Sequence, residues 1–364
     1  MILRWTTFAL RSRPNLTSNL TSRTPPRCLS FIVTDTKTRT HSTKTLPIPE
    51  ATLTETDIES FKRDAFDAQK PLVLRQDSKK PRSSAFDAGI RAVDRAFQTG
   101  LPVPVDLPYE LVADRDGVRW FATFCKEMLE KRSQNFGSGD RLSQRAHELN
   151  VEISKHLRRW TEMDIPSRQK LLMRFMFGFE LFGELSRNLH EDHEGARGIE
   201  SIYIAQADLG HLSKDLPVPP YVEQAGKGDV YKSSIWMGLG STYTPWHRDP
   251  NPNYFLQLVG SKDVRILPPK RGQGLFNQAM AMIPVNEQSS SRIRGEEMMQ
   301  GAQRDALTET VWGKEAPEGI LSTVLQPGDA LFIPQGWWHS LKGVGEESYP
   351  FWRHANVSCN WWFR

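Results

Sequence analysis

The spacing of hydrophobic residues divides the chain into two regions with different periods. From Thr54 to about Asn188 apolar residues recur mostly at helical spacing, as at Phe86, Ile90 and Val93. This pattern predicts helices near 58–66, 86–97, 118–131, 143–160 and 167–189, with one short buried strand at 72–74. We therefore expect residues 47–200 to form a mostly helical N-terminal region that packs on the rest of the chain.

After Ile199 the hydrophobic period changes to two, which is typical of strands. The pattern predicts strands at 201–205, 234–239, 244–249, 253–259, 263–267, 323–325, 330–333, 337–344 and 355–363. Many short strands separated by Gly and Pro turns favour a sandwich or a barrel. The predicted fold class is therefore mainly β, a barrel at residues 201–364 flanked by N-terminal helices.

One long polar stretch, at about 269–319, interrupts this series of strands. It is rich in Gln, Ser and Arg and offers no clear strand pattern. Structureless loops of this length are uncommon inside compact domains and are usually functional or mobile. We therefore expect an inserted loop here.

Composition supports a globular chain and excludes several other classes. Of the 364 residues, 38% are hydrophobic and 25% are charged, far from the values of disordered chains. Apolar runs are all too short for a membrane-spanning helix, since even the run at 171–185 contains Arg174, Glu180 and Glu184. Three scattered cysteines are too few for a disulfide framework or a cysteine-rich zinc site.

The basic net charge of the chain belongs to its first 46 residues. This segment holds eight Lys and Arg, sixteen Ser and Thr, and one acidic residue, Asp35. An Arg-rich, Ser-rich and acid-poor segment is typical of a mitochondrial transit peptide, and a disordered leader is the alternative. The transit peptide implies a mitochondrial location, and the leader would leave a cytoplasmic or nuclear one. Without the first 46 residues the chain has a net charge of −3, which does not indicate a polyanion-binding protein.

The candidate chemistry lies in His247, Asp249 and His339. Alternate residues of a strand point to one face, so His247 and Asp249 can present an imidazole and a carboxylate to the same point. A second histidine from another strand would complete a set of two His and one carboxylate, which is typical of non-haem Fe(II) oxygenases. His339 ends the segment 328–339 (GDALFIPQGWWH), which predicts a turn, a strand, a turn and another strand.

Lys262 is a second, independent signal. It shares strand parity with Val264 and Ile266, which predicts an inward-facing position. A buried lysine is costly unless an anion pairs with it, and a cosubstrate carboxylate is one such partner. A lysine that reaches solvent beside the Gly260-Ser261 turn remains the alternative from composition alone.

Four segments of the chain resemble the JmjC, cupin-like family of 2-oxoglutarate oxygenases, and in particular its small hydroxylases. They are 203–206 (YIAQ) with 216–219 (LPVP), 243–269 (YTPWHRDPNPNYFLQLVGSKDVRILPP), 328–339, and 356–364 (NVSCNWWFR). The resemblance covers about residues 201–364 outside the insert, and 61–74 match more loosely. It implies a double-stranded β-helix, the cupin or jelly-roll barrel.

The resemblance also implies a role for nine residues. His247, Asp249 and His339 would bind iron. Lys262 and Thr244 would hold the distal carboxylate of 2-oxoglutarate. The remaining matches, Tyr203, Trp236, Asn253 and Asn360, would lie around the cosubstrate and the metal, with ordinary barrel packing as the alternative for Tyr203, Trp236 and Asn360.

The implied function is that of a dioxygenase that uses Fe(II), 2-oxoglutarate and O2 to hydroxylate a C–H bond, with release of succinate and CO2. A protein side chain is the expected substrate. Lysine demethylation and hydroxylation of an RNA base use the same chemistry and remain alternatives, the second through basic residues such as Arg158, Arg174, Arg292 and Arg294. A non-catalytic metal-binding module is a further alternative. The resemblance also permits a homodimer.

Overall fold

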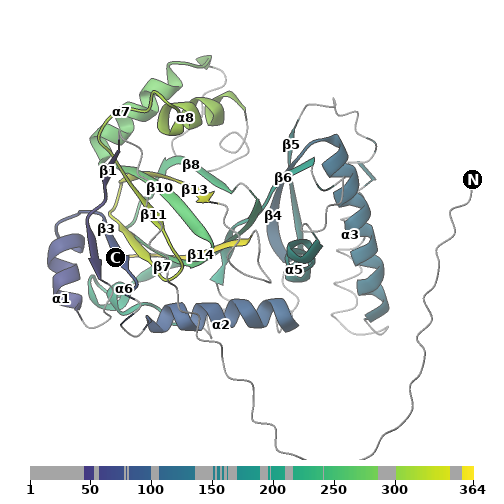
Figure 1. Cartoon of the computed structure of the whole chain (residues 1–364), viewed down its shortest axis with the longest axis horizontal. Helices are drawn as coiled ribbons and strands as arrows, with labels where there is room; N and C mark the ends of the chain where they lie inside the picture. Colours follow the sequence, from purple (N-terminus) through teal and green to yellow (C-terminus); the bar gives the residue numbers. More distant parts are fainter. Residues whose placement is uncertain are drawn as a thin grey trace, which may run out of the picture. The chain divides into compact units, whose positions relative to one another are not determined.

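Two β-sheets form the body of the protein in the computed structural model (Figure 1). The described ranges are 45–52, 57–77, 82–99, 106–135, 170–188, 198–209, 216–240, 242–285, 301–344 and 355–364, with several isolated positions. Residues 1–44, which include almost all of the predicted leader, lie outside them. Within these ranges no helix has the length and apolar character that a membrane span requires.

The smaller sheet has five strands and the larger sheet nine. The smaller one has the order β1 (Thr45–Pro47), β11 (Ile320–Leu325), β10 (Ser261–Leu267), β13 (Trp338–Val344), β8 (Tyr243–Arg248). The larger one has the order β2 (Glu50–Thr52), β3 (Leu72–Arg75), β12 (Ala330–Ile333), β9 (Asn253–Val259), β14 (Ala355–Phe363), β7 (Val230–Gly240), β6 (Ile199–Asp208), β4 (Asp106–Ala113), β5 (Leu171–Gly178). All nine strands predicted after Ile199 are confirmed, with ends that differ by a few residues.

A hydrophobic cluster joins the two sheets face to face. Val264 and Ile266 of β10 pack with Phe255 of β9 and with Leu331 and Ile333 of β12. On β10 the intervening Asp263 and Arg265 remain partly exposed, so burial alternates along the strand. The chain therefore has the cupin-like barrel that the sequence predicts, with the two sheets as its walls.

The N-terminal region contributes strands as well as helices, so the prediction of a mostly helical region is wrong in part. Residues 171–178, predicted as the start of a helix, form β5, in which Met173, Phe175 and Phe177 are buried while Arg174 and Met176 are exposed. Because nearly every residue of this run is apolar, it fits the spacing of a helix as well as that of a strand. The sequence alone therefore does not reveal the alternation of buried and exposed residues. β5 pairs with β4, which the pattern missed, and Phe175 stacks on Tyr109 with ring centroids 5.2 Å apart.

The other predicted helices are found where the chain is described. They are α1 (Ile58–Phe61) continued by the π-helical turn η1 (Lys62–Phe66), α2 (Ser84–Thr99), α3 (Arg115–Asn135), and α5 (Phe179–Asn188), the second half of the predicted helix 167–189. A short helix, α6 (Pro220–Gln224), was not predicted. The predicted helix at 143–160 lies almost entirely outside the described residues.

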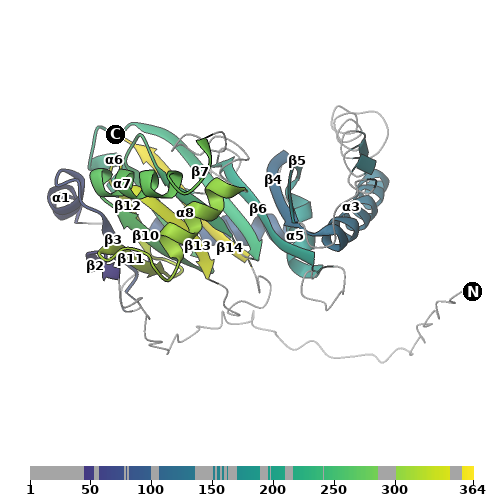
Figure 2. The same ribbon diagram turned by 90° about the horizontal axis from the view of Figure 1, so that it is seen from above.

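The insert at 269–319 contains two helices in its described parts, so the expectation of a loop without secondary structure is wrong there. It contains α7 (Pro269–Met280) and α8 (Ala302–Trp312), which contact each other and lie side by side in both views (Figures 1 and 2). Leu275 and Phe276 of α7 and Leu307 of α8 form an apolar cluster with Trp246 and Trp338 of the smaller sheet. The apolar stripe is short and surrounded by Gln, Arg and Asn, which hid it in the sequence.

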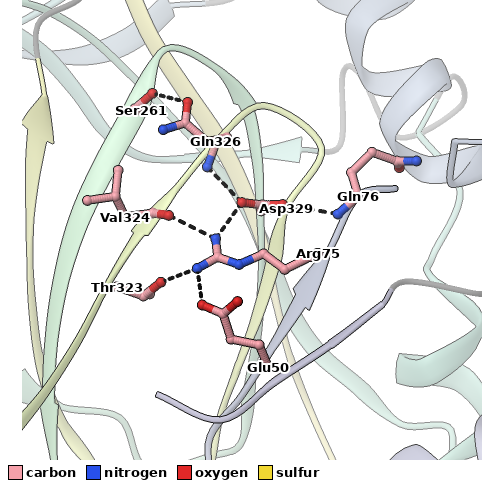
Figure 3. A network of polar contacts seen from close by, with 8 residues as sticks. All are labelled: Glu50, Arg75, Gln76, Ser261, Thr323, Val324, Gln326 and Asp329. Carbon is pink, nitrogen blue, oxygen red and sulfur yellow. Dashed lines mark hydrogen bonds and ion pairs between the residues drawn. The ribbon is translucent and has the colours of Figure 1, made fainter. Parts of the chain in front are cut away.

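Arg75 at the end of β3 ties the N-terminal strands to the barrel (Figure 3). Its guanidinium binds the buried carboxylate of Asp329 at 2.6 Å, the hydroxyl of Thr323 at 2.5 Å, and the carboxylate of Glu50 on β2. Asp329 also accepts the backbone N–H of Gln76 at 3.0 Å. The network thus joins β2 and β3 to the turn that precedes β12.

Candidate metal centre

The smaller sheet brings His247, Asp249 and His339 to one point. His247 is on β8, Asp249 directly follows that strand, and His339 on β13 is the register partner of His247. Their possible ligand atoms all lie within 4.8 Å of one another. Nε2 of His247 is 3.8 Å from Oδ1 of Asp249, and Nε2 of His339 is 3.6 Å from Oδ2.

Backbone carbonyls fix the tautomer of both imidazoles. Nδ1 of His247 lies 2.8 Å from the carbonyl oxygen of Pro245, and Nδ1 of His339 lies 3.1 Å from that of Trp337. Because a carbonyl oxygen only accepts, each Nδ1 carries the proton and donates it. The lone pair of each Nε2 then faces Asp249, which is the arrangement that metal-binding histidines adopt.

Burial and neighbouring charges favour the protonation states that a metal ion needs. Burial lowers the pKa of His339, and the nearby His247 lowers it further against the opposing effect of Asp249. Burial alone would raise the pKa of Asp249, but the two imidazoles and hydrogen bonds from Trp362 and Asn253 bring it below its ordinary value. Two imidazoles and one carboxylate fit a divalent cation and leave further coordination positions open.

These three residues line a cavity between the two sheets. The other lining residues, which include every residue that the resemblance placed around the cosubstrate, are Tyr203, Trp236, Thr244, Asn253, Phe255, Lys262, Ile333, Leu341, Asn360 and Trp362. The structure thus brings all nine of the predicted site residues to one cavity, while their roles remain predictions.

Lys262 is a buried cation in the wall of this cavity. Its ammonium group donates a hydrogen bond of 2.7 Å to Oγ of Ser358 and lies 5.2 Å from the ring centroid of Phe255. Lys262 is only 3% exposed, and burial lowers its pKa from 10.5 to about 7. An anionic ligand would supply the charge that this ammonium group needs.

Thr244 and Tyr203 lie in the same wall. Thr244 is on β8, and its side chain is hydrogen-bonded to the hydroxyl of Tyr203 on β6. Burial raises the pKa of the Tyr203 hydroxyl, which therefore stays protonated. The cavity thus presents two hydroxyl groups in addition to the ammonium group of Lys262.

The carboxylate of Asp249 is linked by hydrogen bonds to Asn253 and, through Asn253, to Asn360 and Trp236. Asn253 donates a hydrogen bond of 2.9 Å to Oδ2 of Asp249, and Trp236 donates one of 2.9 Å to Oδ1 of Asn360. The resemblance placed these residues around the cosubstrate. In this structure their direct contacts are with Asp249 and with one another.

Two residues of the site, Ser358 and Trp362, were missed by the sequence interpretation. Ser358 accepts the hydrogen bond of Lys262, and Nε1 of Trp362 donates to Oδ2 of Asp249 at 2.9 Å. Both lie two positions from Asn360 on β14, so the strand period places all three on one face. The sequence alone could have indicated Ser358 and Trp362, because a strand that turns Asn360 toward the interior turns these two residues the same way.

The chain is similar in sequence to several curated proteins. The chain is 28% identical over 159 residues to lysine-specific demethylase JMJ30 of Arabidopsis thaliana. The aligned region covers 42% of this chain and 34% of that protein. It is 27% identical over 172 residues to Jumonji C domain-containing protein 5 of Drosophila melanogaster, with 44% and 38% covered. A third relative, lysine-specific demethylase 8 of Danio rerio, is 28% identical over 148 residues, with 39% and 33% covered.

The chain spans about a third of the length of these curated relatives. The match to a family is much longer, since residues 59–364 fit the family described as the cupin-like domain. This range contains every strand of the two sheets except β1 and β2, and the whole metal centre. The chain therefore belongs to the cupin-like family of JmjC domains.

Proposed function

We propose that this protein is an Fe(II)- and 2-oxoglutarate-dependent dioxygenase that hydroxylates a C–H bond. The observation that supports the proposal best is that His247, Asp249 and His339 face the same cavity as the buried Lys262. A metal-binding module without catalysis has no need for a buried cation in the wall of that cavity. The 2-oxoglutarate chemistry requires both features.

Each residue then has a role that its position supports. His247, Asp249 and His339 would hold the iron ion, and the ammonium group of Lys262 would pair with the distal carboxylate of 2-oxoglutarate. The hydroxyl groups of Thr244 and Tyr203 would donate to the same carboxylate. With O2, the bound ion and cosubstrate supply an oxidant strong enough to hydroxylate a C–H bond, and yield succinate and CO2.

The protein itself orients these groups and limits the access of water. Ile333 and Leu341 place apolar side chains in the same cavity as the residues that would bind the iron and the residues that would bind the cosubstrate. A dry cavity strengthens the ion pair between Lys262 and a carboxylate and limits oxidation in the absence of substrate.

We propose a protein side chain as the substrate. Two relatives are named lysine-specific demethylases, which supports a protein substrate. Hydroxylation of a protein side chain can then have two outcomes. Hydroxylation of an N-methyl group releases formaldehyde, whereas hydroxylation of a side-chain carbon leaves a stable alcohol. Incubation with a peptide library separates the two, because one lowers the peptide mass and the other raises it by one oxygen atom.

Two measurements test the dioxygenase proposal itself. We expect a weak visible charge-transfer band when the protein is mixed with Fe(II) and 2-oxoglutarate without oxygen, followed by succinate after aeration. The variant Lys262→Met should show neither at the same cosubstrate concentration, and the exposed Lys270→Met should behave as the wild type. Binding of a divalent metal with no band and no succinate would instead support a metal-binding module.

A further inference from the structure

The two tryptophans that precede the metal-centre histidines lie on the outer face of the smaller sheet. Trp246 comes directly before His247 on β8, and Trp338 comes directly before His339 on β13. Successive residues of a strand point to opposite faces, so the indoles lie behind the imidazoles that face the cavity. Both indoles are fully buried, and their ring centroids are 6.1 Å apart with an angle of 23° between the planes.

Helix α7 of the insert packs directly on this pair of indoles. Nε1 of Trp246 donates a hydrogen bond of 3.2 Å to the backbone carbonyl of Gly272, and the ring centroid of Phe276 lies 5.2 Å from that of Trp338. A methyl group built on Gly272 would lie 2.3 Å from both Cγ and Cδ1 of Trp338. A glycine, which has no Cβ, therefore lets α7 approach the indole this closely.

The backbone beside each tryptophan connects these contacts to the imidazoles. Each imidazole donates its Nδ1 proton to the carbonyl two residues before it, 2.8 Å away for His247 and 3.1 Å away for His339. In both cases that carbonyl belongs to the peptide bond whose nitrogen is the backbone nitrogen of the tryptophan. A displaced tryptophan therefore also displaces the carbonyl that orients the imidazole. Outer hydrogen-bond partners of this kind orient metal ligands and tune the affinity for the ion.

We propose that Gly272, Trp246 and Trp338 are positioning residues of the metal centre, and that α7 holds both histidines in place through the two indoles. The inference rests on the proposed metal site. It gives the insert at 269–319 a role in that site, although none of its described residues lines the cavity.

The size of the contact supports this role. Because ordinary contact begins at 3.4 Å, a methyl group on Gly272 would force α7 and Trp338 about 1 Å apart, which exceeds the roughly 0.5 Å within which a functional site must be held. The clash involves Cβ, Cγ and Cδ1 of Trp338, which lie close to the backbone of β13. The indole cannot avoid it by turning its far end, so either the strand or the helix must move.

The Co(II) affinity of two glycine variants tests the inference. Gly272→Ala places a methyl group against Trp338, whereas a methyl group on Gly274 of the same helix meets no atom within 4 Å. Both substitutions replace a helical glycine by the better helix former, so Gly274→Ala is the matched control. Disturbed outer partners weaken metal binding by about 10- to 100-fold, so we expect Gly272→Ala to bind Co(II) at least tenfold more weakly. Gly274→Ala should bind Co(II) like the wild type in the same titration, followed by visible absorption.

A second readout follows the imidazoles without any metal. In protein labelled with 15N on histidine, the ring-nitrogen signals of His247 and His339 are assigned from the variants His247→Gln and His339→Gln. We expect Gly272→Ala to shift the signals of His339, and Gly274→Ala to leave them in place. If α7 only covered the sheet, Gly272→Ala would lower the melting temperature without moving these signals.

Phe276→Leu tests the same inference without a steric clash. It removes the ring that packs on Trp338 from α7 and keeps an apolar side chain of similar size at a buried position. We expect weaker Co(II) binding and shifted His339 signals, both to a smaller extent than in Gly272→Ala. This variant decides the question if Gly272→Ala does not fold, and Co(II) affinity and signals equal to those of the wild type would then overturn the inference.

The outcomes separate the inference from the proposed function. A Co(II) affinity or His339 signals of folded Gly272→Ala equal to those of Gly274→Ala would overturn the inference while the metal site stands. Failure of the wild-type protein to bind Co(II) would overturn the proposed function and the inference with it. Shifted signals together with weaker Co(II) binding in Gly272→Ala, but not in Gly274→Ala, support both.

Discussion

Replacing Lys262 by Met should affect stability and cosubstrate binding in opposite directions. Burial lowers the pKa of Lys262 from 10.5 to about 7, so the folded protein disfavours the charged form. A shift of that size corresponds to about 5 kcal/mol of lost stability at low pH, since one pKa unit is worth about 1.4 kcal/mol. Met has a similar length and carries no charge, so it removes this cost.

The gain is partly offset at Ser358. Its buried hydroxyl group accepts the hydrogen bond of Lys262, and an unsatisfied buried partner costs about 1–3 kcal/mol. We therefore expect Lys262→Met to raise the free energy of unfolding at pH 6 by roughly 2–4 kcal/mol. The measurement is urea unfolding of the metal-free protein, with Lys270→Met as an exposed lysine control.

The pH dependence identifies the cause of this gain. A lysine whose pKa is lower in the folded state destabilises the protein fully below pH 7, and the cost disappears as the pH rises toward the unfolded value of 10.5. The advantage of Lys262→Met should accordingly shrink by roughly 2–3 kcal/mol between pH 6 and pH 9. A pH-independent difference would mean that packing, and not charge burial, explains the result.

Cosubstrate binding should show the opposite effect. Loss of one partner of a buried charge pair costs about 2–5 kcal/mol, so 2-oxoglutarate should bind to the Mn(II)-loaded variant roughly 30-fold or more weakly. Calorimetry on the wild type, Lys262→Met and Lys270→Met measures this directly. Equal affinities in all three proteins would refute the assignment of Lys262 as the carboxylate partner.

Three further predictions address the metal, the fold and the leader. Asp249→Ala should abolish 2-oxoglutarate turnover, and retained succinate formation would contradict its role as a metal ligand. Arg75→Met leaves the buried Asp329 without its ion pair and should lower the free energy of unfolding by about 3–5 kcal/mol in urea, whereas the exposed Arg82→Met should change it little. Residues 1–46 fused to a fluorescent protein should direct it to mitochondria, and a cytosolic signal would contradict the transit-peptide prediction.

The sequence determined most of the strands of the barrel and the strand face on which its functional groups lie. Successive residues of a strand point to opposite faces, so residues two positions apart share a face. This alternation puts His247 on the same face as Asp249, and Lys262 on the same face as the inward residues Val264 and Ile266 of β10. The strands after Ile199 were readable for the same reason. A strand with one buried face leaves a strong pattern in the sequence.

Tertiary structure decided the parts in which local pattern is ambiguous or absent. Residues 171–178 are apolar at both periods, and only pairing with β4 makes them a strand. The helices α7 and α8 depend on a short apolar stripe that is stable only against Trp246 and Trp338 of the barrel.

The hydrogen bonds around Asp249 show the same division at the level of single atoms. The sequence indicated that His339 could complete the set, but the register of β13 against β8 is what places it opposite His247. The hydrogen bonds from Trp236 to Asn360 and from Asn360 to Asn253 form because strands β7, β14 and β9 lie side by side. Sequence fixes which groups a strand presents to the barrel interior, whereas the pairing of distant strands decides which of those groups touch.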